Sequence, residues 1–419
     1  AASALLVGHS FVLAVDLFSA ASRSALGFGL MRREMDPLVG VLRPMLGGLH
    51  LAASLLLPVI AARGLALERE RRSYGALALA AGGTTQVVLA KGAAALLASL
   101  SLLAPVLVLS AVFVSLGGHV DAPETSVALL GHALHLVAFT GVALAAAAAA
   151  RSVAQATTAA VAVSLASWAV DAGEGFAALA WLGRLDAASV SKQLEPFERG
   201  VVPLGSIAWF TALGATATTI ALLLARLESP RRRWPPALLA AFVGGVALVL
   251  AGGNQRAYDR SEQRRASLPP AAVEALRAIR APITVTLHLD RDDGRRAQVE
   301  RDALARLRLA RPDLRIDTPL DLRTQPSEGE REEGYGRIVV RVGSAVRETR
   351  STSRREIVTL VFEAAGRPLP DWSQPAYAGY PTVIEGRRRA LVSVVAYLAL
   401  PLGLLILGSF ATRIRRKPS

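Results

Sequence analysis

The stretch VVLAKGAAALLASLSLLAPVLVLSAVFVSL, residues Val87–Leu116, decides the fold class of this chain. It runs for 30 residues and contains a single charged side chain, Lys91. About 20 apolar residues in a helix are enough to cross the hydrocarbon core of a bilayer. Because hydrocarbon offers no hydrogen-bond partners, the backbone of such a segment must satisfy itself, as a helix does. The stretch therefore predicts a transmembrane helix.

Seven further apolar stretches surround it, and together they predict an α-helical polytopic membrane protein with about eight spans. The complete set is Ala4–Ala20, Val41–Ala62, Val87–Leu116, Val127–Ala150, Val153–Val170, Pro203–Leu227, Pro236–Gly252 and Ala390–Ala411. The composition agrees with this interpretation, since 52% of the residues are hydrophobic and the mean hydropathy is +0.40. Charged residues make up 19%, compared with roughly 25% in soluble domains.

One segment departs from this apolar character. Residues 253–389 hold 26 of the 47 Lys and Arg residues and 20 of the 33 Asp and Glu residues. Helical and strand patterns alternate there, in the order Pro269–Arg280, Pro282–Leu289, Arg295–Ala310, Leu314–Thr318 and Arg337–Val342. The alternation predicts an α/β domain, thioredoxin- or flavodoxin-like, inserted between the last two spans.

The short loops predict the orientation of the chain. With the N-terminus inside, fourteen Lys and Arg residues fall on the cytoplasmic side and seven fall in outer loops. An excess of Lys and Arg marks the cytoplasmic side, whereas long domains are translocated largely regardless of charge. We therefore expect a bacterial inner-membrane protein with both termini in the cytoplasm and residues 253–389 in the periplasm.

Composition and motifs exclude several functional classes. The chain has no Cys, which rules out thiolate nucleophiles and zinc–thiolate sites. It has no Walker A motif, because the Gly-rich run Ala81–Thr85 lacks the Lys that reaches phosphates. No catalytic set is evident in residues 253–389, so the chain is not expected to be an enzyme. Nucleic-acid binding is not expected despite the net charge of +14, since the basic residues flank apolar runs or alternate with acids.

A charged loop joins the second and third spans and reads PVIAARGLALERERRSYGALALAAGGTTQVVLAK, Pro58–Lys91. It resembles the first cytoplasmic loop of ABC-2-type permeases, where an acidic–basic pair leads to a short Leu-rich helix and a Gly-Lys begins the next span. Ser73-Tyr74 stands where that family has Gly-Thr, and Ala81-Gly82-Gly83 stands where it has a Pro turn. The resemblance implies that this loop couples to an ATPase through Glu68, Arg69, Glu70, Arg71, Arg72, Ser73, Tyr74 and Leu77.

The same loop predicts a docking surface from its residues alone. Leu77, Ala80 and Ala81 recur at the spacing of one helix face. An amphipathic helix of this kind can lie in an apolar groove of a soluble partner. The alternative is a charged, solvated loop between two spans.

Two more stretches carry a resemblance. Glu195–Phe210, EPFERGVVPLGSIAWF, resembles the outer loop before the sixth span of gliding-motility-type and copper-maturation-type ABC-2 permeases, with the pattern on Phe197, Arg199 and Gly200. Arg256–Asp290 resembles the opening of the membrane-anchored auxiliary protein encoded beside such permeases. The implied domains are a six-span permease (1–230), a seventh span (231–252), a periplasmic auxiliary domain (253–389) and an eighth span with a basic tail (390–419).

This resemblance implies the permease subunit of an ABC transporter that drives export or extrusion. ATP and Mg²⁺ would bind to a separate cytoplasmic ATPase, expected as a dimer, and no cofactor would bind to this chain. The other expected partners are a second permease copy or homologue, membrane lipid and a periplasmic or envelope protein. Two alternatives stay open: an ATP-driven mechanotransmitter that acts through the periplasmic domain, and a metal-handling maturation permease.

Polar side chains inside the predicted spans are further candidates. His9, Asp16 and Arg23 recur every seven residues and so share one helix face, for a substrate or gating role or for a structural polar contact. His132 and His135 lie one turn apart on another helix. With His119, Asp121 and Glu124 they are weak candidates for a metal site, although interfacial histidines are the favoured interpretation.

Overall fold

The computed structural model describes residues 1–27, 29–32, 35–173, 189–226, 229–254, 256–290, 293–319, 334–370 and 377–414. Among these residues, eight helices are long and apolar enough to cross a membrane. They span Ala2–Leu26, Leu38–Glu70, Thr84–Ser115, Ala122–Ala149, Val153–Val170, Leu204–Leu224, Pro230–Gly252 and Arg387–Ser409. Each overlaps one predicted span, so the prediction of a polytopic helical protein is confirmed.

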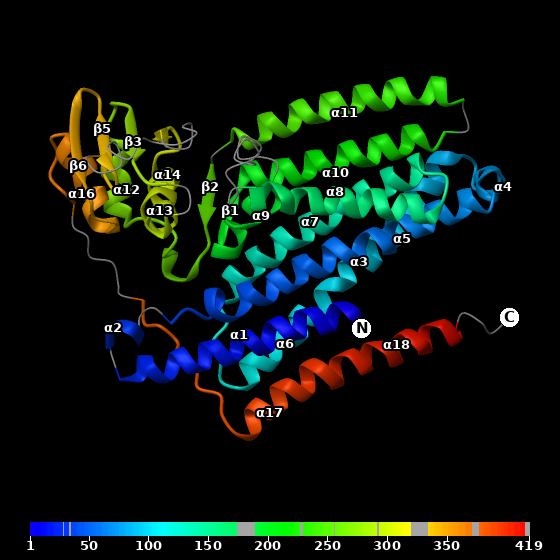
Figure 1. Cartoon of the computed structure of the whole chain (residues 1–419), viewed down its shortest axis with the longest axis horizontal. Coiled ribbons are helices and arrows are strands. Elements are labelled where there is room, and N and C mark those ends of the chain that lie inside the picture. The colour runs from blue at the N-terminus through cyan, green and yellow to red at the C-terminus, as the bar shows by residue number, and fades with distance from the viewer. Residues whose placement is uncertain are drawn as a thin grey trace.

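The helices of these spans and their connections carry the labels of Figure 1. They are α1 (Ala2–Leu26), α3 (Arg43–Glu70), α5 (Thr84–Leu100), α6 (Ala104–Ser115), α7 (Ala122–Ala149), α8 (Val153–Gly173), α10 (Leu204–Leu224), α11 (Pro230–Gly252), α17 (Arg387–Val394) and α18 (Leu400–Ile414). Shorter helices are α2 (Gly29–Arg32), α4 (Tyr74–Ala80) and α9 (Val190–Leu194). The basic tail residues Arg415, Arg416 and Lys417 lie outside the described residues.

Local sequence determines where the helices begin and end. The carboxylate of Asp121 accepts a hydrogen bond of 2.9 Å from the backbone N–H of Glu124, and Pro123 lies in the first turn, so α7 begins at Ala122. Gly117, with φ of 93°, lies just beyond α6, where few other residues could adopt this conformation. Short caps of this kind let successive spans reverse direction.

Small residues bring the central helices together. A Cβ on Gly141 of α7 would lie 2.9 Å from the carbonyl oxygen of Gly214 on α10, and a Cβ on Gly214 would lie 3.2 Å from the Cα of Ala138. Small side chains permit this close backbone approach between membrane helices. The largest fully buried side chains of the bundle include Phe11, Met45, Leu136 and Phe210.

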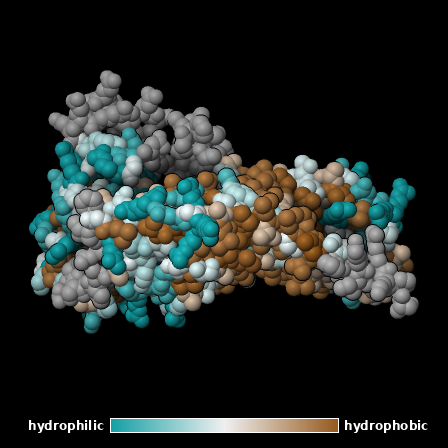
Figure 2. All heavy atoms as spheres, turned by 90° about the horizontal axis from the view of Figure 1, so that it is seen from below, coloured by the Kyte–Doolittle hydropathy of each residue, from teal (hydrophilic) through white to brown (hydrophobic). Residues whose placement is uncertain are grey.

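The outer surface of the bundle is apolar. Leu17 is 72% exposed and Val249 is 74% exposed, and such side chains recur on most of the long helices. In the space-filling view they form a hydrophobic band between hydrophilic ends (Figure 2). A surface of this size and composition is suited to lipid rather than to water.

A four-stranded sheet with the strand order β4-β3-β5-β6 occupies the segment between the last two spans. The strands are β3 (Ile283–Leu287), β4 (Arg315–Asp317), β5 (Ile338–Val342) and β6 (Ala345–Thr349). Its helices are α12 (Pro270–Arg277), α13 (Gly294–Val299), α14 (Ala305–Ala310) and α16 (Arg354–Ala364). Alternate residues of β3 and β5 are buried, and they share one hydrophobic core with these helices.

The sheet is mixed. β3 pairs with β4 in parallel, whereas β3 with β5 and β5 with β6 are antiparallel. A flavodoxin-like sheet is parallel, so the two antiparallel pairs do not fit that half of the prediction. The predicted strands at Pro282–Leu289, Leu314–Thr318 and Arg337–Val342 correspond to β3, β4 and β5.

The sheet and α4 lie at opposite ends of the helical bundle (Figure 1). A two-stranded antiparallel ribbon lies between the bundle and the sheet, formed by β1 (Val201–Pro203) before α10 and β2 (Ala257–Asp259) after α11. The chain therefore has one polar region at each end of an apolar bundle.

We expect Gly141→Val to destabilise the bundle by about 1–3 kcal/mol, because the added carbons must displace α10. The matched control is Gly245→Val on α11, where a Cβ meets no atom within 4 Å. Thermal unfolding of the purified protein in detergent measures both. Equal shifts for the two variants would contradict the close contact of α7 and α10.

Candidate functional site

Glu68 organises the loop at the α4 end of the bundle. Its carboxylate accepts hydrogen bonds from the hydroxyl of Ser73 at 2.6 Å and from the ammonium of Lys91 at 2.9 Å. The backbone N–H of Ser73 also donates to the carbonyl oxygen of Glu68 at 3.0 Å. One side chain thus joins the end of α3, the start of α4 and the body of α5.

Glu70 and Arg69 attach the same loop to its neighbours. The carboxylate of Glu70 accepts a hydrogen bond of 2.8 Å from the backbone N–H of Val153, at the N-terminus of α8. The guanidinium of Arg69 lies 5.8 Å from the ring centre of Tyr74, a cation–π contact, and Tyr74 is buried. Five of the eight residues assigned to the loop by resemblance therefore hold it in place.

The outward face of α4 differs from the predicted one. Leu77 is half-buried and packs against the bundle core, so it does not belong to an exposed stripe. Leu79 is 84% exposed instead, beside exposed Ala80. Arg71 and Arg72 are also exposed. The surface offered to solvent is thus a single Leu with small residues and two cations close by in the chain.

The loop Phe197–Gly200 is packed into the end of the bundle opposite α4. Phe197 is fully buried, and a Cβ on Gly131 of α7 would lie 2.6 Å from its ring. Gly200 adopts φ of 71°, and its carbonyl oxygen accepts a hydrogen bond of 2.8 Å from the backbone N–H of Arg260. Arg199 pairs with Glu195 one helical turn earlier. This loop therefore positions β1 against β2.

An ion-pair cluster joins the sheet segment to the bundle at this end. The guanidinium of Arg265 lies 2.7 Å from a carboxylate oxygen of Asp36, before α3, and 2.7 Å from one of Glu124, in the first turn of α7. It also lies 4.6 Å from the ring centre of Tyr377. We call Asp36, Glu124, Arg265 and Tyr377 the junction cluster.

In the junction cluster, burial and the neighbouring charges shift the pKa values in opposite directions. Burial raises the pKa of Asp36 above its ordinary value, although Arg265 acts in the other direction. Burial lowers the pKa of Arg265, but the carboxylates of Asp36 and Glu124 outweigh it and raise that pKa above its ordinary value. One permanently charged cation therefore serves two carboxylates.

Glu262 makes a second set of contacts beside the cluster. It accepts a hydrogen bond of 2.6 Å from the hydroxyl of Tyr380 and lies 3.2 Å from the imidazole of His119, whose ring is stacked on Tyr380. The hydrogen bond to Glu262, together with burial, raises the pKa of Tyr380. The backbone N–H of Tyr380 donates to the carbonyl oxygen of Met35 at 2.9 Å. Contacts among Met35, His119, Glu262 and Tyr380 thus bring four segments that lie far apart in the chain together at one place.

The two histidines of α7 do not form a metal site with their predicted neighbours. His132 lies 3.2 Å from Glu198, which also accepts a hydrogen bond of 3.0 Å from Arg43. Burial raises the pKa of Glu198, but His132 and Arg43 outweigh it and hold that pKa below its ordinary value. His135 packs against His50 with ring centres 4.9 Å apart.

The remaining metal candidates have other partners. Asp121 caps α7, Glu124 binds Arg265 and His119 stacks on Tyr380. Within the described ranges, no group of three or more His, Asp or Glu side chains could hold a metal ion.

The stripe of His9, Asp16 and Arg23 lies against the C-terminal part of the chain. His9 bonds to the hydroxyl of Tyr397 at 2.8 Å, Asp16 pairs with Arg389 at 2.9 Å and Arg23 pairs with Glu385 at 2.8 Å. A Cβ on Gly8 would lie 2.8 Å from the carbonyl oxygen of Ala396, so the two helices are in close contact here. These contacts favour the interpretation that the three side chains make structural polar contacts rather than serve a substrate or gating role.

Comparisons with protein-family models, with curated proteins and with solved structures found no match to this chain.

Sequence reasoning missed the junction cluster. Each of its charged residues, Asp36, Glu124 and Arg265, lies beside an apolar run or in a charged segment. At such positions a charged side chain is ordinarily exposed to solvent. The one available signal was Glu124, an acid placed inside the first turn of a membrane-length helix. A partner for it could not be read from spacing, because Arg265 lies 141 residues later.

Replacing Arg265 by Met leaves two carboxylates without their cation, and we expect a loss of about 3 kcal/mol in the free energy of unfolding. Because the pKa of Asp36 is already raised, the folded variant binds protons more readily than the unfolded chain, so the loss shrinks as the pH falls. Thermal unfolding in detergent across a pH series measures this. The exposed neighbour Arg264→Met is the control, and the same loss in that variant would refute the assignment.

Proposed function

We propose that this chain is the permease subunit of an ABC transporter, which couples ATP hydrolysis by a separate cytoplasmic ATPase to export or extrusion across the bacterial inner membrane. The observation that carries the proposal is the α4 end of the bundle. There, Leu79 and Arg72 are exposed, while Glu68 and Glu70 bind the loop to neighbouring spans. A displacement of α4 would pass to α3, α5 and α8 as a rigid-body shift.

The charges at this end support a cytoplasmic location for α4. Arg151, which precedes α8, and Arg231 and Arg232, in the first turn of α11, are exposed. The hydrogen bond from Val153 to Glu70 brings the first of these segments to the end of α3. In this orientation the sheet, at the opposite end of the bundle, is periplasmic (Figure 1).

The solubilised wild-type chain is expected to co-purify from its host with a Walker-containing ATPase and to show ATP hydrolysis. Leu79→Asp should reduce the retained ATPase by at least about tenfold, because it places an anion in an apolar docking contact. The matched control is Val346→Asp, an exposed apolar residue on β6. A wild-type chain that purifies alone, or an equal loss of retained ATPase in both variants, would contradict the permease proposal.

A second candidate, supported by the junction cluster, is mechanotransmission. The sheet segment is held to the bundle by Arg265 and by the β1–β2 ribbon, so a movement of the spans would reach it. Its parallel βαβ unit, followed by an antiparallel hairpin and a helix, supports a thioredoxin-like periplasmic domain that acts on an envelope partner. The metal-handling alternative has no candidate site within the described ranges.

The chain has no Cys, so two spin labels can be placed without background. Labels on Val346→Cys in the sheet and Arg151→Cys at the other end should report a change in their distance when the complete complex binds ATP. The reference sample is the same labelled complex with ADP. An unchanged distance distribution would contradict mechanotransmission.

A further inference from the structure

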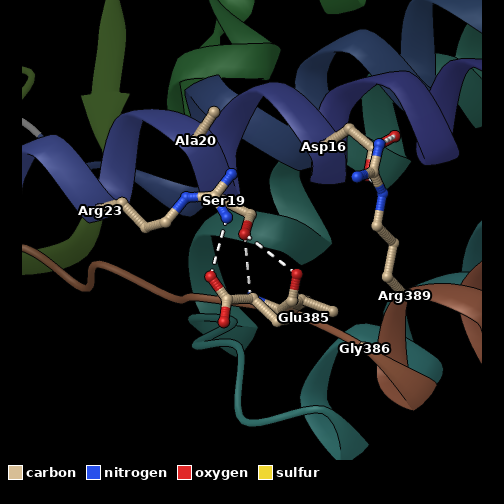
Figure 3. A pocket seen from close by; sticks show the side chains of 8 residues that line it. Asp16, Ser19, Ala20, Arg23, Glu385, Gly386 and Arg389 are labelled. Atoms are coloured by element: carbon tan, nitrogen blue, oxygen red, sulfur yellow. Dashed lines mark hydrogen bonds and ion pairs between the residues drawn. The ribbon is translucent and has the colours of Figure 1, made fainter.

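A pocket of about 330 Å³ lies between α1 and the segment that leads into α17 (Figure 3). Its lining residues are Asp16, Ser19, Ala20, Arg23, Ile384, Glu385, Gly386 and Arg389. Because α17 begins at Arg387, the pocket lies where the last span starts. A span that begins at Arg387 would place the pocket near the level of the lipid head groups.

Two ion pairs frame the pocket, and α1 supplies the cation of one pair and the anion of the other. On one side Arg23 of α1 pairs with Glu385, and on the other Asp16 of α1 pairs with Arg389 (Figure 3). Each wall thus supplies one cation and one anion, and the four charges sum to zero. The hydroxyl of Ser19 accepts a hydrogen bond of 2.9 Å from the backbone N–H of Ile384, which fixes the two walls against each other.

The charged side chains remain available to a ligand. Arg389 is 62% exposed and Glu385 is 60% exposed, while Asp16 is more enclosed, at 30%. Exposed ion pairs contribute little to stability, so their groups can exchange partners at small cost. A ligand with its own cation and anion could therefore satisfy both walls at once.

Apolar side chains continue from the pocket along the membrane-facing surface. Leu13 and Leu17 on α1 are exposed, as are Leu391 and Val394 on α17. Leu13 lies one helical turn before Asp16, so this apolar face of α1 adjoins the pocket. A molecule held in the pocket by its polar group would thus have an apolar face of α1 beside it for hydrocarbon chains.

We propose that this pocket binds a phospholipid whose head group carries a primary amine. The phosphate would bind the guanidinium groups of Arg23 and Arg389, and the ammonium would donate hydrogen bonds to Asp16 and Glu385. An anionic head group without an amine would face both carboxylates unpaired. A quaternary ammonium has no N–H to donate, so choline lipids fit less well. The inference does not depend on the proposed transport function.

The test measures lipid retained by the full-length chain in detergent, by native mass spectrometry. The three probes are phosphatidylethanolamine, phosphatidylcholine and phosphatidylglycerol with identical acyl chains. We expect the ethanolamine lipid to be retained several-fold more than the other two. Equal retention of all three, or preferential retention of the glycerol lipid, would overturn the proposal.

Variants locate the site. Asp16→Asn should reduce retention of the ethanolamine lipid to the level of the choline lipid, whereas exposed Arg388→Gln, which does not line the pocket, should leave it unchanged. Ala20→Phe fills the pocket without removing a charge and should abolish the preference even where Asp16→Asn impairs folding. Unchanged preference in Ala20→Phe, or the same loss in Arg388→Gln, would place the lipid elsewhere.

Discussion

The absence of water from the hydrocarbon core is the constraint on which the rest of the structure depends. In the described part of the chain, eight membrane-length helices satisfy their own backbone groups and leave apolar side chains outside. Much of the specific ionic chemistry is consequently found near the helix ends, around Glu68 at one end and Arg265 at the other. These are also the places where a soluble partner or domain can attach without entering lipid.

Length and apolar content are local properties, which is why the spans could be predicted one by one. The same holds for β3 and β5, whose alternating apolar residues show their buried faces. Strand β6, Ala345–Thr349, was missed because it lies at the edge of the sheet and is largely exposed, so it lacks such alternation. The strands of the β1–β2 ribbon are three residues long, too short for any period to be visible.

Spacing along one helix correctly grouped His9, Asp16 and Arg23, but it could not supply their partners. The residues they contact lie between 362 and 388 positions away in the chain, and only tertiary packing brings them together. Leu77 and Leu79 show a second limit of helical spacing. Helical spacing identified a face of α4, yet which face meets the bundle depends on how the helix is tilted, and burial of Tyr74 turns Leu77 inward.

The segment around Thr382 links the spans to the sheet in a way that bears on both proposed functions. The backbone N–H of Tyr380 bonds to Met35 before α3, and that of Thr382 bonds to the hydroxyl of Ser22 on α1 at 3.0 Å. A sliding of α1 against α3 would pull these two bonds in different directions. The hydroxyl of Tyr380 also donates a hydrogen bond to Glu262, beside the junction cluster. This short stretch of chain therefore contacts α1, the segment before α3 and the start of the sheet segment at once.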